Sequence, residues 1–328
     1  MQTIEKEIGD RYGIEVSRLS QYKDALLIES SLGKKLLRRN QCDIAKIEFI
    51  HKAKEHLYEN NFKNIDRYLC TTEGTPFFLF GGNCYTISNM IEGRECNFEE
   101  RNDIILATQS LAALHKASKG FVPDPSTQNY NELGKLPFYL TKRLGELKKL
   151  KKIAEKGRSK FDHKFLEYVD YFYQLGENVI HNISNGVYDK LVEKTAEEGI
   201  ICHHDYTHHN IIIDKKQVSV INFNYCCHEL KVYDIANLIR RKMRKCNWNI
   251  EEARVIINEY RKINEISKEE FFVLKLMLEF PQKFWRVANK YYNSRRNRVE
   301  TSYILRLQEV IDEIDHSANF LKQFHTLI

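Results

Sequence analysis

The stretch that decides the fold runs from Ile201 to Asn237 and reads ICHHDYTHHNIIIDKKQVSVINFNYCCHELKVYDIAN. The β-branched residues at its start predict a short strand, and the polar run that follows predicts a turn. Two more β-rich segments predict a hairpin, and the last residues predict the start of a helix. This order places Asp205 and Asn210 on one loop and Asn222 at the end of the second hairpin strand.

The spacing of these three side chains suggests phosphate chemistry. An aspartate beside a phosphate-accepting hydroxyl can orient it and take its proton, and an amide oxygen five residues later can help hold a divalent cation beside a nucleotide. Asp205 and Asn210 have that spacing. Because magnesium favours charged oxygen ligands, a carboxylate is expected at the next turn, where the sequence has Asn222, with Asn224 in place of a second acid. Asn210 and Asn222 are therefore predicted to be weak metal ligands.

Four segments carry a resemblance to known proteins. They are CHHDYTHHN (Cys202–Asn210), VINFNYC (Val220–Cys226), VYDIANLIRR (Val232–Arg241) and FPQKFWRVANKYYNSR (Phe280–Arg295). The first two resemble the aminoglycoside phosphotransferase, or choline kinase-like, branch of the protein-kinase fold. The last two resemble more closely the spore coat protein S (CotS) family of spore-forming bacteria. With weaker similarity in the first half, the resemblance spans nearly the whole chain.

The resemblance implies an α+β, bilobed, protein-kinase-like fold. Residues 1–92 would form a small antiparallel β lobe with a helix, and residues 93–328 a larger, mostly helical lobe that carries the catalytic-like loop. The patterning of the chain agrees, because alternating apolar residues dominate the first part and helical periodicity follows from about Phe98. The expected strands are Val16–Tyr22, Ala25–Ser30, Lys35–Arg39, Tyr68–Cys70, Phe77–Phe80 and Cys84–Met90, and the expected helices include Met1–Tyr12, Asp43–Asn60 and Phe98–Lys116.

The same resemblance implies which residues hold a nucleotide. The strand lysine that steadies phosphates aligns with Arg38, and Lys35 is the alternative, although strand alternation places it on the opposite face. A solvated basic strand explains both residues equally well. Glu92 falls in the expected hinge, where backbone groups meet an adenine ring. The glutamate that pairs with the strand lysine could be Glu48 or Glu55, and a surface position suits both.

The histidines near the loop allow a second interpretation. His203, His204, His208 and His209 form two pairs at the i, i+4 spacing of a helical zinc site. Their strand-forming flanks argue against a helix and therefore against that site. The resemblance assigns His203 a structural role in the loop instead. Asp234, at the start of a helix, is predicted to brace the loop or to cap its own helix.

Composition limits the classes of function. A hydrophobic content of 42% excludes a disordered chain, and a net charge of +6 permits an acidic ligand such as a nucleotide but is too small for a dedicated nucleic-acid binder. Arg295, Arg296 and Arg298 lie near tyrosines, yet no RNA-binding motif accompanies them. None of the eight cysteines forms a CxxC pair, which argues against a zinc ribbon. No signal segment and no membrane span are expected.

Two functions are open to such a chain. The first is a spore coat component whose kinase fold is a catalytically degenerate scaffold, a pseudokinase with other coat proteins as partners. The second is an ATP- and magnesium-dependent phosphotransferase with Asp205 as base, acting on a small molecule or a coat protein. We favour the scaffold, with weak nucleotide binding, because Asn222 removes a charge that the reaction needs. The expected location is the mother-cell cytoplasm during sporulation and then the spore coat.

Overall fold

The computed structural model describes residues 3–41, 43–125, 130–294 and 299–328. It forms two compact units. The first comprises Met1–Asn131 and Glu198–His228, and the second comprises Glu132–Glu197 and Glu229–Ile328. The first unit contains the whole of the expected small lobe, residues 1–92, together with the loop around Asp205.

A five-stranded antiparallel sheet dominates the first part of the chain, with strand order β1-β2-β3-β5-β4. The strands are β1 (Val16–Tyr22), β2 (Ala25–Ser30), β3 (Lys35–Asn40), β4 (Phe78–Phe80) and β5 (Asn83–Asn89). Five of the six expected strands are thus confirmed in place. The sixth, Tyr68–Cys70, was wrong, because Tyr68 forms only an isolated bridge to Ser88 before the Thr71–Thr75 hydrogen bond turns the chain.

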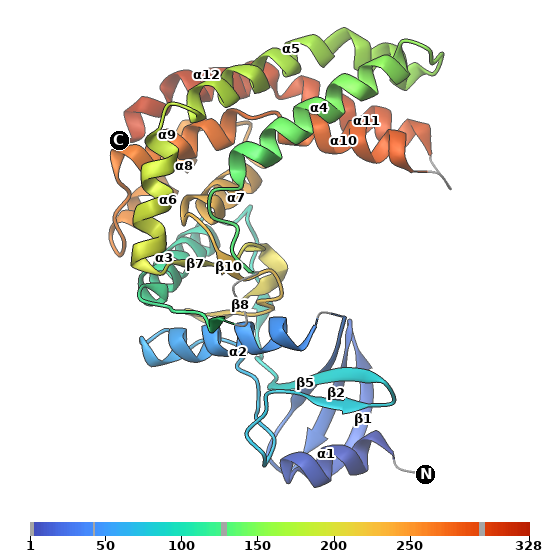
Figure 1. The fold of residues 1–328 in the computed structure, drawn as a ribbon, viewed down its shortest axis with the longest axis vertical. Coiled ribbons are helices and arrows are strands. Elements are labelled where there is room, and N and C mark those ends of the chain that lie inside the picture. Colours follow the sequence, from blue (N-terminus) through green and yellow to red (C-terminus); the bar gives the residue numbers. More distant parts are fainter. Residues whose placement is uncertain (1–2, 42, 126–129, 295–298) are drawn as a thin grey trace. The chain divides into compact units, whose positions relative to one another are not determined.

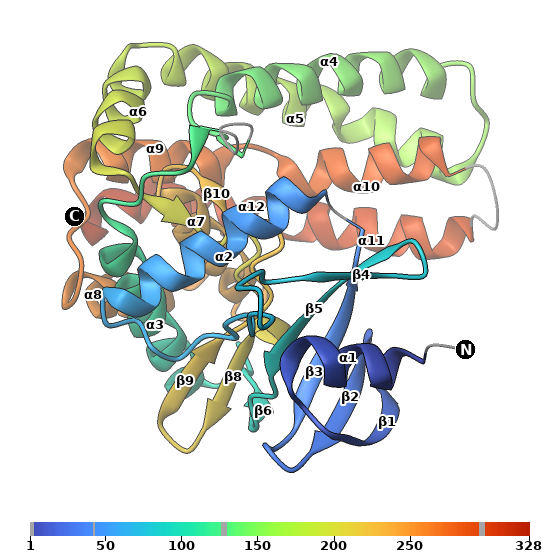
Figure 2. The same ribbon diagram turned by 60° about the horizontal axis from the view of Figure 1, so that its bottom comes forward.

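Helix α1 (Ile4–Tyr12) lies against this sheet, as Figures 1 and 2 show. Its Ile8 joins a fully buried cluster with Ile28, Leu37 and Ile87 from three strands. Because side chains alternate across a strand, the neighbours of Leu37 on β3 point to the opposite face. Arg38 is one of them, so the strand turns its charge away from the α1 core.

Helix α2 (Ile44–Glu59) begins where the sequence predicts it. Asp43 caps it by accepting a 2.7 Å hydrogen bond from the backbone N–H of Lys46. The helix contacts α3 (Arg101–Ser118), which matches the expected helix from Phe98. After α2 the chain runs beside β9 (Gln217–Val220), where the N–H of Val220 donates to the carbonyl of Asn64 at 2.9 Å.

The deciding stretch folds as its pattern predicts. Strand β7 (Ile201–Cys202) pairs with β10 (Cys227–His228), and a 3₁₀ turn at His208–Asn210 leads into β8 (Ile211–Asp214). Strands β8 and β9 form the hairpin, and β6 (Arg94–Glu95) pairs with the other edge of β8. The predicted turn and hairpin are confirmed.

The second unit is helical. In Figure 1 its long helices α4 and α5 run side by side, and α10 and α11 form a second pair. The α+β class is therefore confirmed. No helix in the described ranges has both the length and the apolar character needed to span a membrane. Arg295, Arg296 and Arg298 lie outside the described residues. The helices are α4 (Leu136–Ala154), α5 (Lys160–Ile183), α6 (Val187–Glu198), α7 (Val232–Met243), α8 (Ile250–Arg261), α9 (Lys268–Glu279), α10 (Gln282–Asn293), α11 (Glu300–Asp312) and α12 (Ile314–Gln323).

Candidate functional site

Three side chains predicted from the sequence meet in the first unit. The Nδ2 group of Asn210 donates to the backbone carbonyl of Asp205 at 2.9 Å and to its carboxylate at 3.0 Å. Asn222 donates from its own Nδ2 to Oδ1 of Asn210 at 3.2 Å. Asn222 adopts φ 65°, a left-handed conformation that asparagine tolerates better than most residues. The loop and the strand end are therefore joined by one chain of hydrogen bonds.

His203 joins the same two segments from beneath. Its ring is fully buried, and its Nε2 lies 3.0 Å from the carbonyl oxygen of Ile221. The backbone N–H of Asp205 donates to the other ring nitrogen at 3.3 Å. Because Nδ1 accepts this bond, Nε2 carries the proton and donates to Ile221. His203 thereby holds the backbone of Asp205 beside Ile221, which directly follows β9.

Asp66 adds a carboxylate that the sequence analysis did not identify. Its Oδ2 accepts a 3.1 Å hydrogen bond from the backbone N–H of Asn222 and lies 4.0 Å from the guanidinium of Arg38. Its Oδ1 lies 2.9 Å from the ammonium of Lys54 on α2. The side chain is only 6% exposed, and that of Lys54 is 1% exposed. Arg38 thus faces an aspartate that is already neutralised by a buried lysine.

Lys54 lies on the helix α2, from which Glu48 or Glu55 was considered as the partner of the strand cation. Its ammonium also donates to the backbone carbonyl of Asp66 at 2.7 Å and lies 3.9 Å from the ring centre of Tyr68. Burial lowers the pKa of Lys54, and the carboxylate of Asp66 opposes that shift. The signs of charge are therefore reversed relative to the expected pair, with the cation on the helix and the anion on the segment after it.

The other predicted nucleotide residues lie apart from this network. The ammonium of Lys35 donates to the carbonyl of Leu32 at 2.9 Å and to the side chain of Asn89 at 3.1 Å, on the face of β3 opposite Arg38. Glu55 pairs with Arg67 rather than with a residue of β3. Glu92 is largely exposed, with Lys34 as its partner at 3.4 Å. The structure brings Arg38, but neither Lys35 nor the Glu92 side chain, to the Asn222 network.

A narrow cleft opens beside Arg38 and Asp66. Its volume is about 70 Å³, well below the roughly 300–1,000 Å³ of pockets that take small molecules. Apolar side chains from both sides, Leu36 and Ile212 among them, suit a flat ring, so the residue types fit a nucleotide base. The lining comprises Tyr22, Lys23, Asp24, Leu36, Arg38, Asp66, Asn89, Met90, Ile91, Gly93, Glu95, Ile212 and Ile221.

Two histidines of the loop lie beside an acid. His208 and His209 lie with Glu95 so that one donor atom of each is within 4.8 Å of the others, an arrangement that could bind a divalent metal ion. They belong to a 3₁₀ turn, not to the α-helix that the i, i+4 zinc interpretation requires.

Asp234 lies in the first turn of α7, in the second unit, and is fully buried. Its bracing role stays a prediction.

The residues missed in the sequence carried one usable signal. Lys54 shares the apolar side of its helix with Ile47, Ile50 and Leu57, and all four are buried. A lysine in such a stripe needs a buried partner, because an unpaired buried charge is costly. Nothing in the sequence identifies Asp66 as that partner.

Comparison with known proteins identifies spore coat relatives of this chain. The family model described as "Spore coat putative kinase YutH" matches residues 5–324. Spore coat protein S of Bacillus subtilis (strain 168) is 22% identical over 310 residues, which cover 92% of this chain and 86% of that relative. The resemblance to spore coat proteins is thereby confirmed.

Solved structures support the fold. An aminoglycoside phosphotransferase from Alicyclobacillus acidocaldarius superposes with a TM-score of 0.87 at 19% identity, covering 99% of this chain and 96% of that one. Spectinomycin phosphotransferase APH(9)-Ia, solved with ADP and spectinomycin, has a TM-score of 0.61 at 14% identity, and 97% of each chain is covered. The predicted kinase-like fold is confirmed.

Proposed function

The chain belongs to the spore coat putative kinase YutH family, and we propose that it is a spore coat component whose kinase fold acts as a scaffold with little or no phosphoryl transfer. One observation carries the proposal. The carboxylate of Asp66, which accepts from the backbone N–H of Asn222, is paired with the ammonium of Lys54 at 2.9 Å. Position 222, just after β9, holds the uncharged Asn222.

Phosphoryl transfer depends on positive charge placed where negative charge develops on the phosphates. Magnesium neutralises the transferred phosphates and needs hard, preferably anionic, oxygen ligands. The amide oxygen of Asn210 accepts a hydrogen bond from Asn222 and would have to exchange it for a metal. Asp205 supplies one carboxylate to this group. A site with one available carboxylate and a cleft of about 70 Å³ should bind magnesium-ATP weakly.

Family membership supports a proposal about location and partners. A relative that matches most of the chain is named spore coat protein S. We infer synthesis in the mother-cell cytoplasm, deposition on the forming spore, and other coat proteins as partners. A fluorescent fusion imaged during sporulation should form a ring around the forespore. Diffuse signal at every stage would contradict this location.

The catalytic side of the proposal is tested with the purified full chain. Magnesium-ATP binding is measured by calorimetry, and ATP consumption is measured alongside the Asp205→Asn variant. We expect weak binding and no consumption above the level of that variant. Tight binding together with consumption that disappears in Asp205→Asn would replace the scaffold with an enzyme.

A second function is favoured by one specific contact. Asn210 donates to the carboxylate of Asp205 at 3.0 Å, and a hydrogen bond of this kind can fix the orientation of a general base. Under this alternative the protein is an ATP- and magnesium-dependent phosphotransferase acting on a small molecule or a coat protein. Arg38 would then contact the phosphates, and Asn210 and Asn222 would ligate the metal.

A further inference from the structure

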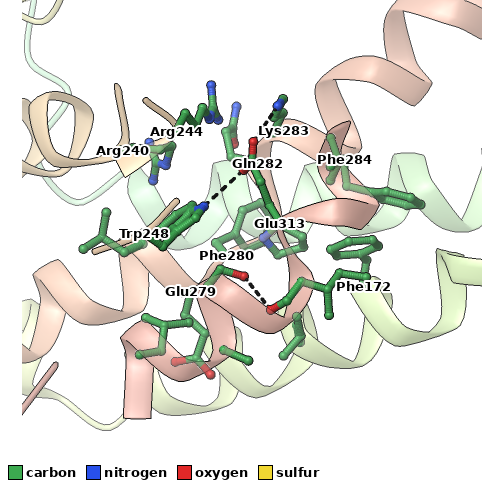
Figure 3. A pocket seen from close by; sticks show the side chains of 18 of the residues that line it. Phe172, Arg240, Arg244, Trp248, Glu279, Phe280, Gln282, Lys283, Phe284 and Glu313 are labelled. Atoms are coloured by element: carbon green, nitrogen blue, oxygen red, sulfur yellow. Dashed lines mark hydrogen bonds and ion pairs between the residues drawn. The ribbon is translucent and has the colours of Figure 1, made fainter. Parts of the chain in front are cut away.

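The second unit contains a pocket of about 290 Å³. It shares no lining residue with the narrow cleft beside Arg38 and Asp66, called the nucleotide-type cleft below. Figure 3 shows its two kinds of wall. Arg240, Arg244 and Lys283 lie along one side, and the rings of Phe172 and Phe284 form the other. The two rings stack with centroids 4.1 Å apart. Charge and aromatic surface thus face one space whose size is close to the lower end of the small-molecule range.

Neither arginine of this pocket forms a direct ion pair with a described carboxylate, although Glu313 and Glu309 oppose the lowering of the pKa of Arg244 by burial. Arg240 donates to the side chain of Asn237 at 3.0 Å and to the backbone carbonyl of Met277, and it forms no ion pair with a described residue. The Nε of Arg244 is buried without a hydrogen-bond partner among the described residues. Both side chains are half-buried, and two adjacent guanidinium groups that lose part of their water without a directly paired anion are unfavourable.

Two acids, Glu279 and Glu313, line the pocket, and Glu313 is engaged with other side chains. Glu313 accepts from Nε1 of Trp248 at 3.3 Å and from the ammonium of Lys283 at 2.8 Å, as the dashed lines in Figure 3 mark. Burial, with the nearby cations, lowers the pKa of Arg240 to about 9. The guanidinium therefore stays charged near neutral pH but lies in surroundings that favour an added anion.

We propose that this pocket binds a small organic anion, with its acidic group at Arg240 and Arg244 and its aromatic or aliphatic body between Trp248 and the Phe172–Phe284 pair. Guanidinium groups bind carboxylates, sulfonates and phosphates through charge-assisted hydrogen bonds. The aromatic wall gives such a ligand an apolar contact that an inorganic ion would leave unused. This site is independent of the nucleotide-type cleft and of whether that cleft is active.

The test uses the full chain carrying Trp285→Phe, so that Trp248 is the remaining one of the two tryptophans. Its fluorescence is titrated with 4-phenylbutyrate, with phenyl phosphate and with 4-phenylbutanamide, the uncharged isostere of the first. Both anions should change the fluorescence of Trp248, and the amide should bind about tenfold or more weakly than the carboxylate. This comparison needs no change in the pocket itself.

Two variants then locate the charge. Arg244→Gln should weaken 4-phenylbutyrate binding about tenfold or more, whereas Arg241→Gln, three residues earlier and exposed, should leave it within about twofold. Thermal melting of both variants checks their folding. Equal affinity for acid and amide, equal losses in the two variants, or no response of Trp248 to either anion would each overturn the proposal.

Discussion

The ammonium of Lys54 lies 2.9 Å from the carboxylate of Asp66, and both side chains are almost completely buried. This pair has the opposite polarity to the strand-cation and helix-acid pair that the resemblance implies. It leaves Arg38, 4.0 Å from the same carboxylate, without the free anionic partner on the helix that was expected. The pair joins α2 to the segment that runs beside β9 within the first unit.

Removing one partner of this pair should destabilise the protein strongly. Asp66→Asn leaves the charge of Lys54 buried and should lower the free energy of unfolding by about 3–5 kcal/mol. Asp124→Asn is the matched control, because it removes an exposed partner 2.6 Å from Lys52, and it should cost less than about 1 kcal/mol. Urea unfolding followed by circular dichroism measures both. Similar small losses would contradict the burial of the pair.

Removing both charges should restore part of that loss. The double variant Lys54→Met and Asp66→Asn leaves no uncompensated charge in the interior, so it should be more stable than Asp66→Asn alone by roughly 1–3 kcal/mol. The same unfolding experiment measures the difference. A double variant less stable than the single one would show that Lys54 contributes mainly through other contacts, such as its 3.9 Å approach to Tyr68.

A carboxylate at position 222 should improve metal binding. Asn222→Asp places a negative charge beside Oδ1 of Asn210, and aspartate tolerates the left-handed backbone found there. The magnesium concentration needed for an ATP-induced thermal shift should fall by about tenfold or more. Gln217→Glu adds the same charge at an exposed position of β9 and should have little effect. An equal response from both variants would mean that general charge, not ligation, is responsible.

Gly93 should be intolerant of any side chain. It has φ 139°, and an added Cβ would lie 2.8 Å from both the Ile212 side chain and the carbonyl oxygen of Ile213. Gly93→Ala should therefore cost roughly 2–5 kcal/mol through strain and overpacking. Gly81→Ala has a positive φ but no atom within 4 Å, so it should cost only about 1–2 kcal/mol. Thermal unfolding compares the two, and equal losses would contradict the close contact.

Glu229 should make stability depend on pH. Burial raises its pKa to about 8 from an ordinary value of 4.5, so the folded chain binds more protons than the unfolded chain between these values. The free energy of unfolding should fall as pH rises through this window. Glu229→Gln should be close to the parent below pH 4.5 and more stable by about 2 kcal/mol or more above pH 8. A difference that does not change with pH would show that Glu229 ionises normally.

Local structure was largely predictable from the sequence. The alternation in Val16–Tyr22 and Ala25–Ser30, the cap at Asp43 and the turn-and-hairpin pattern after Ile201 all appear in the structure. These features depend on residues close together in the chain, which is why periodicity and capping identify them. The spacing of Asp205, Asn210 and Asn222 likewise placed three interacting side chains on one loop and the adjoining strand end.

The partners of buried charges were decided by tertiary structure alone. Lys54 pairs with Asp66 because the segment after α2 runs beside β9. Lys35 donates to Asn89, on the face of β3 opposite Arg38, because β3 pairs with β5. The pocket beside Arg240 and Arg244 likewise needs side chains from α5, α9, α10, α11 and α12. The sequence by itself determined the strands, the helices and the loop of polar side chains, because short-range patterns specify them. Only the folded chain decided which charges neutralise one another, because desolvation and pairing depend on residues that are distant in sequence and close in space.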